Sequence, residues 1–136
     1  MNRRGFVSGI GLGALTTPGL AAGETTGVII QTFLKAAENR RAELGQFITL
    51  NWLPVDRAGI EAGIFTYARL FETVDDPDCD FVMEVGYIDP GGYAGSVVET
   101  FTAIRSAHEI VLVNGLGLSE LGVILGERSY RPVASA

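Results

Sequence analysis

Hydrophobic residues recur along this chain with two periods, and the period changes several times. Residues 26–35, TGVIIQTFLK, carry apolar or β-branched side chains at both odd and even positions, which is typical of a strand buried on both faces. Residues 64–74 and 81–88 show the same pattern. The segment DDPD between them favours a tight turn, so these two strands are predicted to form an antiparallel hairpin.

Residues 38–53 have helical spacing instead. One face of this segment collects large apolar side chains: Leu44, Phe47, Ile48 and Trp52. The opposite face is charged, as expected for a helix that packs on a sheet. Pro54 disfavours helical geometry at the residue before it, so this helix is predicted to end at Leu53.

A second helix is predicted to begin near Tyr93. Its apolar stripe has spacings of four, three and four residues: Val97, Phe101, Ile104 and His108. Residues 110–125 are apolar but interrupted by glycines, and they indicate only a short helix around residues 119–122. Residues 128–134 are predicted to form the last strand, with Pro132 placing it at or near a sheet edge.

The predicted order, strand-helix-strand-strand-helix-strand (βαββαβ), is that of the ferredoxin-like α+β fold. This fold has a four-stranded antiparallel sheet with two helices on one face. The predicted strands are apolar on both faces, yet two helices cover only one. The simplest cover for the other face is a second copy of the chain, so the sequence predicts a homodimer.

In element order and apolar pattern, residues 26–134 resemble the dimeric α+β barrel superfamily. Its members include antibiotic-biosynthesis monooxygenase-like domains and stress-responsive barrel proteins. The resemblance implies a homodimer that binds a small apolar or aromatic compound. It leaves two functions open: a cofactor-independent, monooxygenase-like or acid–base enzyme, and a non-catalytic binding or accessory protein of the cell envelope.

The start of the chain has a different character. Arg3 and Arg4 are followed by Phe6, a glycine-rich apolar run and a group of small residues, which together resemble a bacterial twin-arginine export signal. The apolar run is too short and too often interrupted to span a membrane. Cleavage is predicted after Ala21, which leaves a domain of residues 22–136. The mature protein is therefore expected in the periplasm or outside the cell, with no stable membrane anchor.

The charge of the chain excludes one class of partner. The net charge is −6, from 10 basic and 16 acidic residues. Removing residues 1–21, which contain Arg3 and Arg4, leaves 10 − 2 = 8 basic residues against 16 acidic ones. No basic cluster remains to neutralise phosphates, so no nucleic-acid partner is expected.

Four side chains are candidates for a functional site, and they are predicted to line one cavity between the sheet and its helices. His108 and Glu84 are predicted as catalytic residues, because an imidazole suits proton transfer and a carboxyl in an apolar cavity has a raised pKa. Trp52 and Tyr67 are predicted to bind the substrate. Three of them have an alternative: His108 as a partly exposed residue near a helix end, Trp52 as core filling, and Glu84 as the cross-strand partner of Arg69.

The sequence predicts no metal and no cofactor. A run of four aspartates around the predicted hairpin turn lacks the glycine and the distal glutamate of an EF-hand loop: Asp75, Asp76, Asp78 and Asp80. It is interpreted as a solvated tip. Cys79 is the single cysteine and is interpreted as an incidental loop thiol, so no internal disulfide can form.

Overall fold

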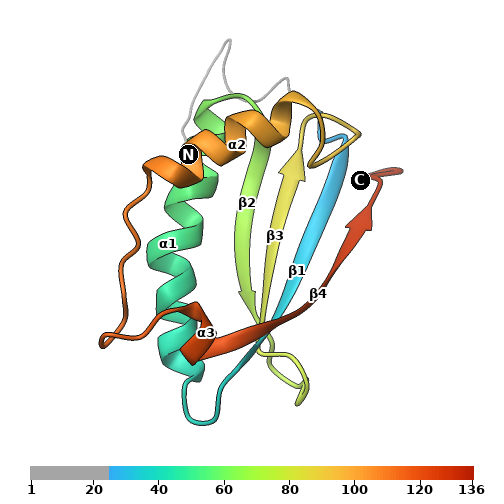
Figure 1. Cartoon of the computed structure of the whole chain (residues 1–136). Coiled ribbons are helices and arrows are strands. Elements are labelled where there is room, and N and C mark those ends of the chain that lie inside the picture. Colours follow the sequence, from blue (N-terminus) through green and yellow to red (C-terminus); the bar gives the residue numbers. More distant parts are fainter. Residues whose placement is uncertain (1–24) are drawn as a thin grey trace.

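The computed structural model describes residues 25–136 (Figure 1). Its elements follow one another as β1 (Val28–Ala36), α1 (Arg41–Glu61), β2 (Phe65–Glu72), β3 (Phe81–Tyr87), α2 (Ser96–Ala107), α3 (Leu118–Leu121) and β4 (Gly122–Tyr130). The strands form one antiparallel sheet in the order β2-β3-β1-β4. The chain therefore has the predicted ferredoxin-like α+β fold, with α1 and α2 on the same face of the sheet.

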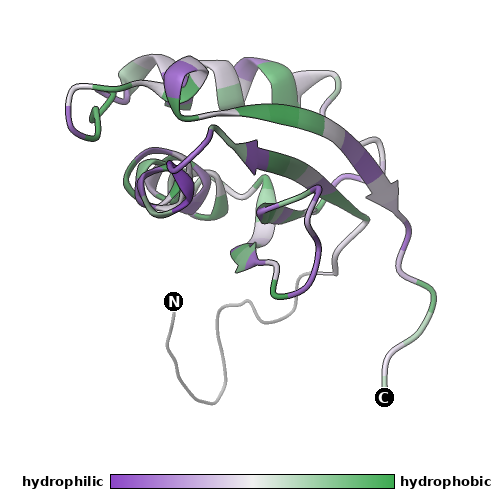
Figure 2. Cartoon of the chain, turned by 90° about the horizontal axis from the view of Figure 1, so that it is seen from below, coloured by the Kyte–Doolittle hydropathy of each residue, from purple (hydrophilic) through white to green (hydrophobic). Residues whose placement is uncertain are grey.

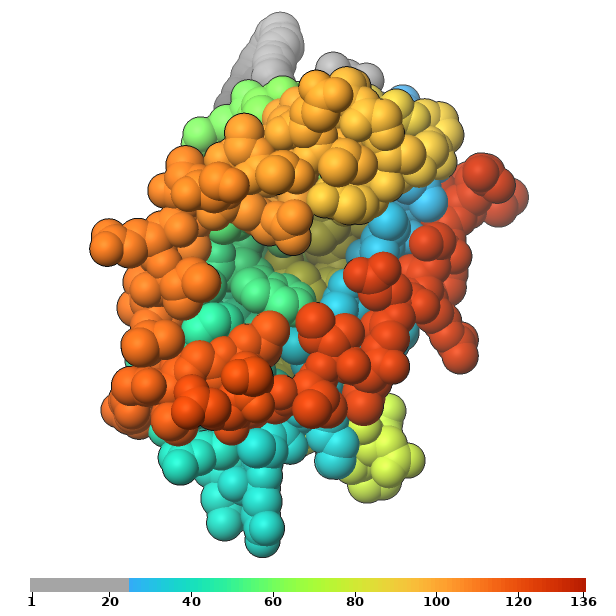
Figure 3. All heavy atoms as spheres, viewed as in Figure 1, coloured from blue at the N-terminus to red at the C-terminus, as the bar shows by residue number. Residues whose placement is uncertain are grey.

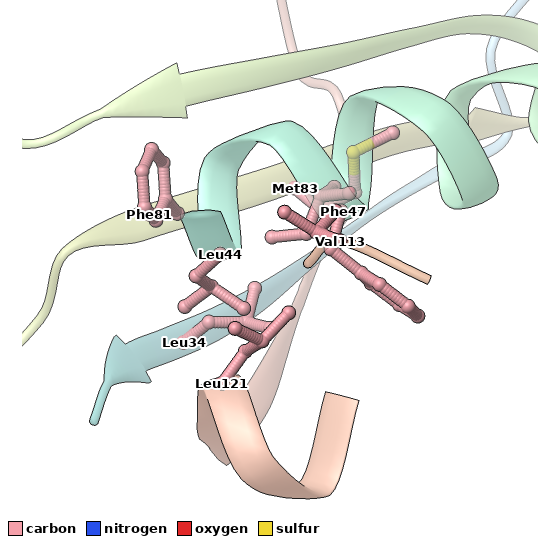
Figure 4. Close-up of a cluster of buried hydrophobic side chains, with 8 residues drawn as sticks. Leu34, Leu44, Phe47, Phe81, Met83, Val113 and Leu121 are labelled. Carbon is pink, nitrogen blue, oxygen red and sulfur yellow. The ribbon is translucent and has the colours of Figure 1, made fainter. Parts of the chain in front are cut away.

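Two groups of buried apolar side chains lie between the helices and the sheet. The first core cluster joins α1 to β1, β3 and α3, and part of it is drawn in Figure 4: Leu34, Leu44, Phe47, Ile48, Phe81, Met83, Val113 and Leu121. The second core cluster lies beneath α2: Val28, Phe65, Tyr87 and Val97. Val85 of β3 packs against both clusters, so it marks the junction between them.

The helix α1 does not end before Pro54, as predicted, but continues to Glu61. A proline inside a helix costs about 3 kcal/mol or more. The two turns after Pro54 bury Val55 and Gly59 and pack Ile60 against the second core cluster. Burying an aliphatic side chain contributes about 1.5–3 kcal/mol, so packing against the sheet outweighs the local preference.

The last strand also differs from the prediction. It covers Gly122–Tyr130 rather than residues 128–134, and Pro132 lies beyond its end. Figure 2 shows that β4 begins apolar and ends hydrophilic, which obscures a strand pattern in the sequence. The predicted edge position is confirmed, because β4 pairs with β1 alone.

The loop between β2 and β3 is not solvated throughout. Asp80 is buried; it accepts a hydrogen bond from the Ala36 backbone N–H (2.7 Å) and one from the Arg41 guanidinium. Arg41 also pairs with Glu72 at 2.9 Å. Cys79 is buried too, with Sγ against the Leu34 and Phe81 carbonyls. Asp80 therefore joins β1 to the start of α1, while Asp75, Asp76 and Asp78 stay exposed as predicted.

None of the helices within residues 25–136 is both long enough and apolar enough to span a lipid bilayer. In the same part of the chain, no three His, Cys, Asp or Glu side chains gather where they could hold a metal ion. The predicted export signal and its cleavage point lie outside the described residues.

Candidate functional site

The structure separates the four predicted site residues onto opposite faces of the sheet. Glu84 and Tyr67 project from β3 and β2 on the face away from the helices, which we call the open face. His108 and Trp52 lie on the helix side, at the end of α2 and in α1. The prediction of one cavity shared by all four residues is therefore wrong. Their individual roles stay predictions.

On the open face, Glu84 is the centre of a small polar group. Its Oε1 accepts a hydrogen bond from the Gln31 side chain (2.7 Å), and its Oε2 accepts one from the Tyr67 hydroxyl (2.8 Å). Burial raises the pKa of Tyr67, and the hydrogen bond to Glu84 raises it further. Both oxygens of Glu84 thus have neutral donors, which leaves the carboxylate without the apolar cavity expected of a catalytic base.

Glu84 and Arg69 are cross-strand neighbours, as the alternative interpretation expects, but their side chains form no ion pair in the described part of the chain. The two residues are directly opposite each other in the β2–β3 ladder. The Arg69 guanidinium instead stacks over the Tyr67 ring, with 4.7 Å between its central carbon and the ring centroid. Gln31, Glu84 and Arg69 are therefore opposite one another across three strands of the open face. The next row on one side is apolar and consists of Phe33, Val82 and Phe71.

His108 is held by a buried residue that the sequence analysis missed, Asn51. The Asn51 Oδ1 accepts hydrogen bonds from the Val111 backbone N–H (2.7 Å) and from His108 Nε2 (3.0 Å). Its Nδ2 donates to the carbonyls of Phe47 (2.9 Å) and Val111 (2.8 Å). Asn51 therefore fastens the segment after α2 to α1, and His108 contributes one bond to that fastening. The helix-end interpretation of His108 fits this geometry.

Trp52, the next residue along α1, is half-buried and packs against the first core cluster. This placement matches the core-filling interpretation. Ligand binding by Trp52 stays a prediction.

Asp56 is the second residue that the sequence analysis missed. It lies one turn after Trp52 on α1, is 6% exposed, and makes no side-chain hydrogen bond to any residue of the described part of the chain. Burial raises the pKa of this carboxyl from its ordinary 3.8 to about 7. In a continuous helix, the spacing of four residues places Asp56 on the same face as Trp52. The predicted helix end at Leu53 concealed this relation, because it placed Asp56 outside the helix.

Tyr87, at the end of β3, is the polar member of the second core cluster. Burial raises its pKa to about 12, and the nearby charges of Asp56 on α1 and Glu127 on β4 also raise it. Arg105 on α2 acts in the opposite direction. The Tyr87 side chain is therefore close to ionisable groups from three other elements, although it is only 8% exposed.

The surface is hollowed on the helix side of the molecule. Figure 3 shows this hollow between α2 and the segment formed by α3 and the start of β4, with α1 on one side and β1 on the other. An aromatic and cationic group lies on α2 and the loop before it: the Tyr93 and Phe101 rings are 6.1 Å apart, and Arg105 lies over Phe101. We refer to the region between the helices and the sheet that contains the buried residues Asp56 and Tyr87, together with Val85, as the helix-side compartment.

Comparison with known proteins adds support for the fold. No protein-family model matches the chain, and no curated protein does. The chain is similar to the crystal structure of PA3566 from Pseudomonas aeruginosa, with a TM-score of 0.50 and 14% sequence identity. That match covers 85% of this chain and 100% of PA3566. At this identity the similarity shows the α+β fold and nothing about activity.

Proposed function

We propose that this protein binds a small, largely apolar molecule in the helix-side compartment. The observation that carries the proposal is the Asp56 carboxyl, buried in an apolar core with no hydrogen-bond partner among residues 25–136. Buried polar groups in folded proteins are paired in the great majority of cases, and an exception calls for a specific explanation. A bound ligand would supply the missing partner.

The same proposal includes a homodimer that forms through the open face. Within the described residues no helix covers this face, and Phe71 on it is 43% exposed. An apolar row of Phe71, Val82 and Phe33 crosses three neighbouring strands there. A second copy of the chain would cover this row and also the Glu84 group.

We place binding ahead of catalysis because His108 and Glu84 do not form an acid–base pair across the sheet. A monooxygenase-like or acid–base enzyme is the second candidate, and a single observation favours it. With a pKa of about 7, Asp56 can accept or release a proton near neutral pH. An enzyme of this kind would lose turnover when Asp56 is changed to Asn, even where the compound still binds.

Native mass spectrometry of protein purified from the periplasm tests both parts of the proposal. We expect a dimer mass with one small molecule per subunit, released when the protein is denatured. A monomer at micromolar concentration would contradict the dimer. A dimer that carries no compound, and that takes up none from a library of apolar and aromatic molecules, would contradict the binding function.

A further inference from the structure

Three side chains on one face of α1 connect the two core clusters. Trp52, Asp56 and Ile60 are four residues apart and so lie one above the other. Trp52 packs against the first core cluster, and Ile60 packs against the second. Asp56 therefore lies at the level of the junction that Val85 marks on the sheet. A carboxyl at this position interrupts an otherwise apolar interface.

A second polar group is buried on the same face of β3, two residues after Val85. The Tyr87 hydroxyl, like the Asp56 carboxyl, forms no hydrogen bond with another side chain or with the backbone in residues 25–136. The two groups are close enough for the charge of Asp56 to act on Tyr87. A buried polar group without a partner destabilises the folded protein, and the helix-side compartment contains two such groups.

We infer that Asp56 and Tyr87 together bind a small apolar molecule through a single hydroxyl group on that molecule. This inference rests on the proposed binding function and specifies its ligand. A carboxyl oxygen of Asp56 accepts a hydrogen bond from the ligand hydroxyl, and the Tyr87 hydroxyl donates one to the ligand oxygen. Both orphaned groups are then satisfied by one uncharged functional group.

The charges near the site favour a hydroxyl over an ionised group. An anionic ligand would meet Asp56 and Glu127, whose charges already disfavour a second anion at Tyr87. A cationic ligand would lose its hydration in the environment that makes ionisation of Asp56 costly. A hydroxyl group escapes both penalties, because it enters the compartment without a charge.

Paired fluorescent probes test the inference directly. 2-Naphthol carries a donor hydroxyl, and 2-methoxynaphthalene has nearly the same shape without the donor. Sites built to bind a hydroxyl reject analogues that lack one, so we expect the mature protein to bind 2-naphthol at least about tenfold more tightly. Affinities are measured by fluorescence titration of each probe.

Two variants and one control identify the residues responsible. Asp56→Leu and Tyr87→Phe keep the bulk of each side chain but remove its polar atoms, so we expect the preference to fall to about threefold or less. Their affinity for 2-methoxynaphthalene should stay within about twofold of the unmodified protein. Glu61→Gln removes an exposed carboxylate from the same helix, and it should leave the preference unchanged.

Failure of the hydroxyl site and failure of the proposed binding function give different results. Equal binding of the two probes, or a preference that survives in Asp56→Leu, overturns the hydroxyl site while leaving the binding function in place. If neither probe binds the unmodified protein, the inference is overturned, and the proposed function fails as well only when the library of apolar and aromatic molecules also gives no bound compound.

Discussion

At the scale of single residues, Asp56 gives the clearest expectation for how stability depends on pH. Its pKa is about 7 in the folded protein and 3.8 ordinarily, so the unfolded chain releases the proton first as pH rises. Below about pH 4 both states are protonated and there is no penalty. Between pH 4 and 7 the folded state loses stability, by on the order of 4 kcal/mol once ionisation is complete.

Asp56→Asn should remove this loss. We expect the free energy of unfolding, measured with urea, to fall less between pH 5 and pH 8 in the variant than in the unmodified protein. The other titrating groups are common to both proteins, so the difference between the two profiles isolates Asp56. Parallel profiles would show that the carboxyl is solvated or paired in solution.

Asn51 and His108 should differ strongly in their contribution to stability. Asn51→Ala removes the partners of both backbone groups of Val111 and should cost about 1–3 kcal/mol. His108→Ala removes one hydrogen bond at a half-buried position and should cost less than about 1 kcal/mol. Hydrogen exchange at the Val111 amide provides a local readout. Equal losses in the two variants would contradict the arrangement described above.

At the scale of elements, a glycine sets how closely α1 approaches the sheet. A Cβ atom at Gly59 would lie 2.4 Å from Cδ2 of the Phe65 ring, too close for the two elements to keep their spacing. Gly59→Ala should therefore lose about 1–2 kcal/mol, although alanine favours helix by about 1 kcal/mol over glycine.

The matched controls for this variant lie on the same helix and the same contact. Gln46→Ala, on the exposed side of α1, should change the melting temperature little. In a Phe65→Leu background, which removes the ring, Gly59→Ala should become neutral or stabilising. A destabilisation of the same size in that background would mean that the contact with Phe65 is not the cause.

At the scale of the whole molecule, the open face should control assembly. Phe71→Lys places a charge in the exposed apolar row, and we expect the dissociation constant of the dimer to rise at least about 100-fold. Gln46→Lys adds the same charge on the helix side and should leave it unchanged. Sedimentation velocity at several concentrations distinguishes the two. Identical behaviour of both variants would rule out an interface on the open face.

Export is also a property of the whole chain. Changing both Arg3 and Arg4 to Lys should keep the protein in the cytoplasm, because the paired arginines are the part of the signal that the twin-arginine pathway recognises. Cell fractionation measures the location, and N-terminal sequencing of the exported protein should begin at Ala22. Undiminished export of the variant, or a mature protein that starts at Met1, would contradict this prediction.

The sequence alone determined the order of the elements and the hairpin between β2 and β3. These features depend on local periodicity and turn chemistry, which neighbouring residues specify by themselves. The sequence also predicted the buried face of α1, because Leu44, Phe47 and Ile48 lie on one side of a helix. The fold class followed from the element order.

Only the tertiary structure decided where α1 and β4 begin and end, and which site residues meet. Burial of Val55 and Gly59 carries α1 past Pro54, and this is what brings Asp56 into the core. The strands are apolar on both faces, so alternation could not tell which face of β3 the helices cover, or that Glu84 lies opposite to Met83 and Val85. That choice depends on contacts between residues far apart in the chain, and a local pattern does not contain them.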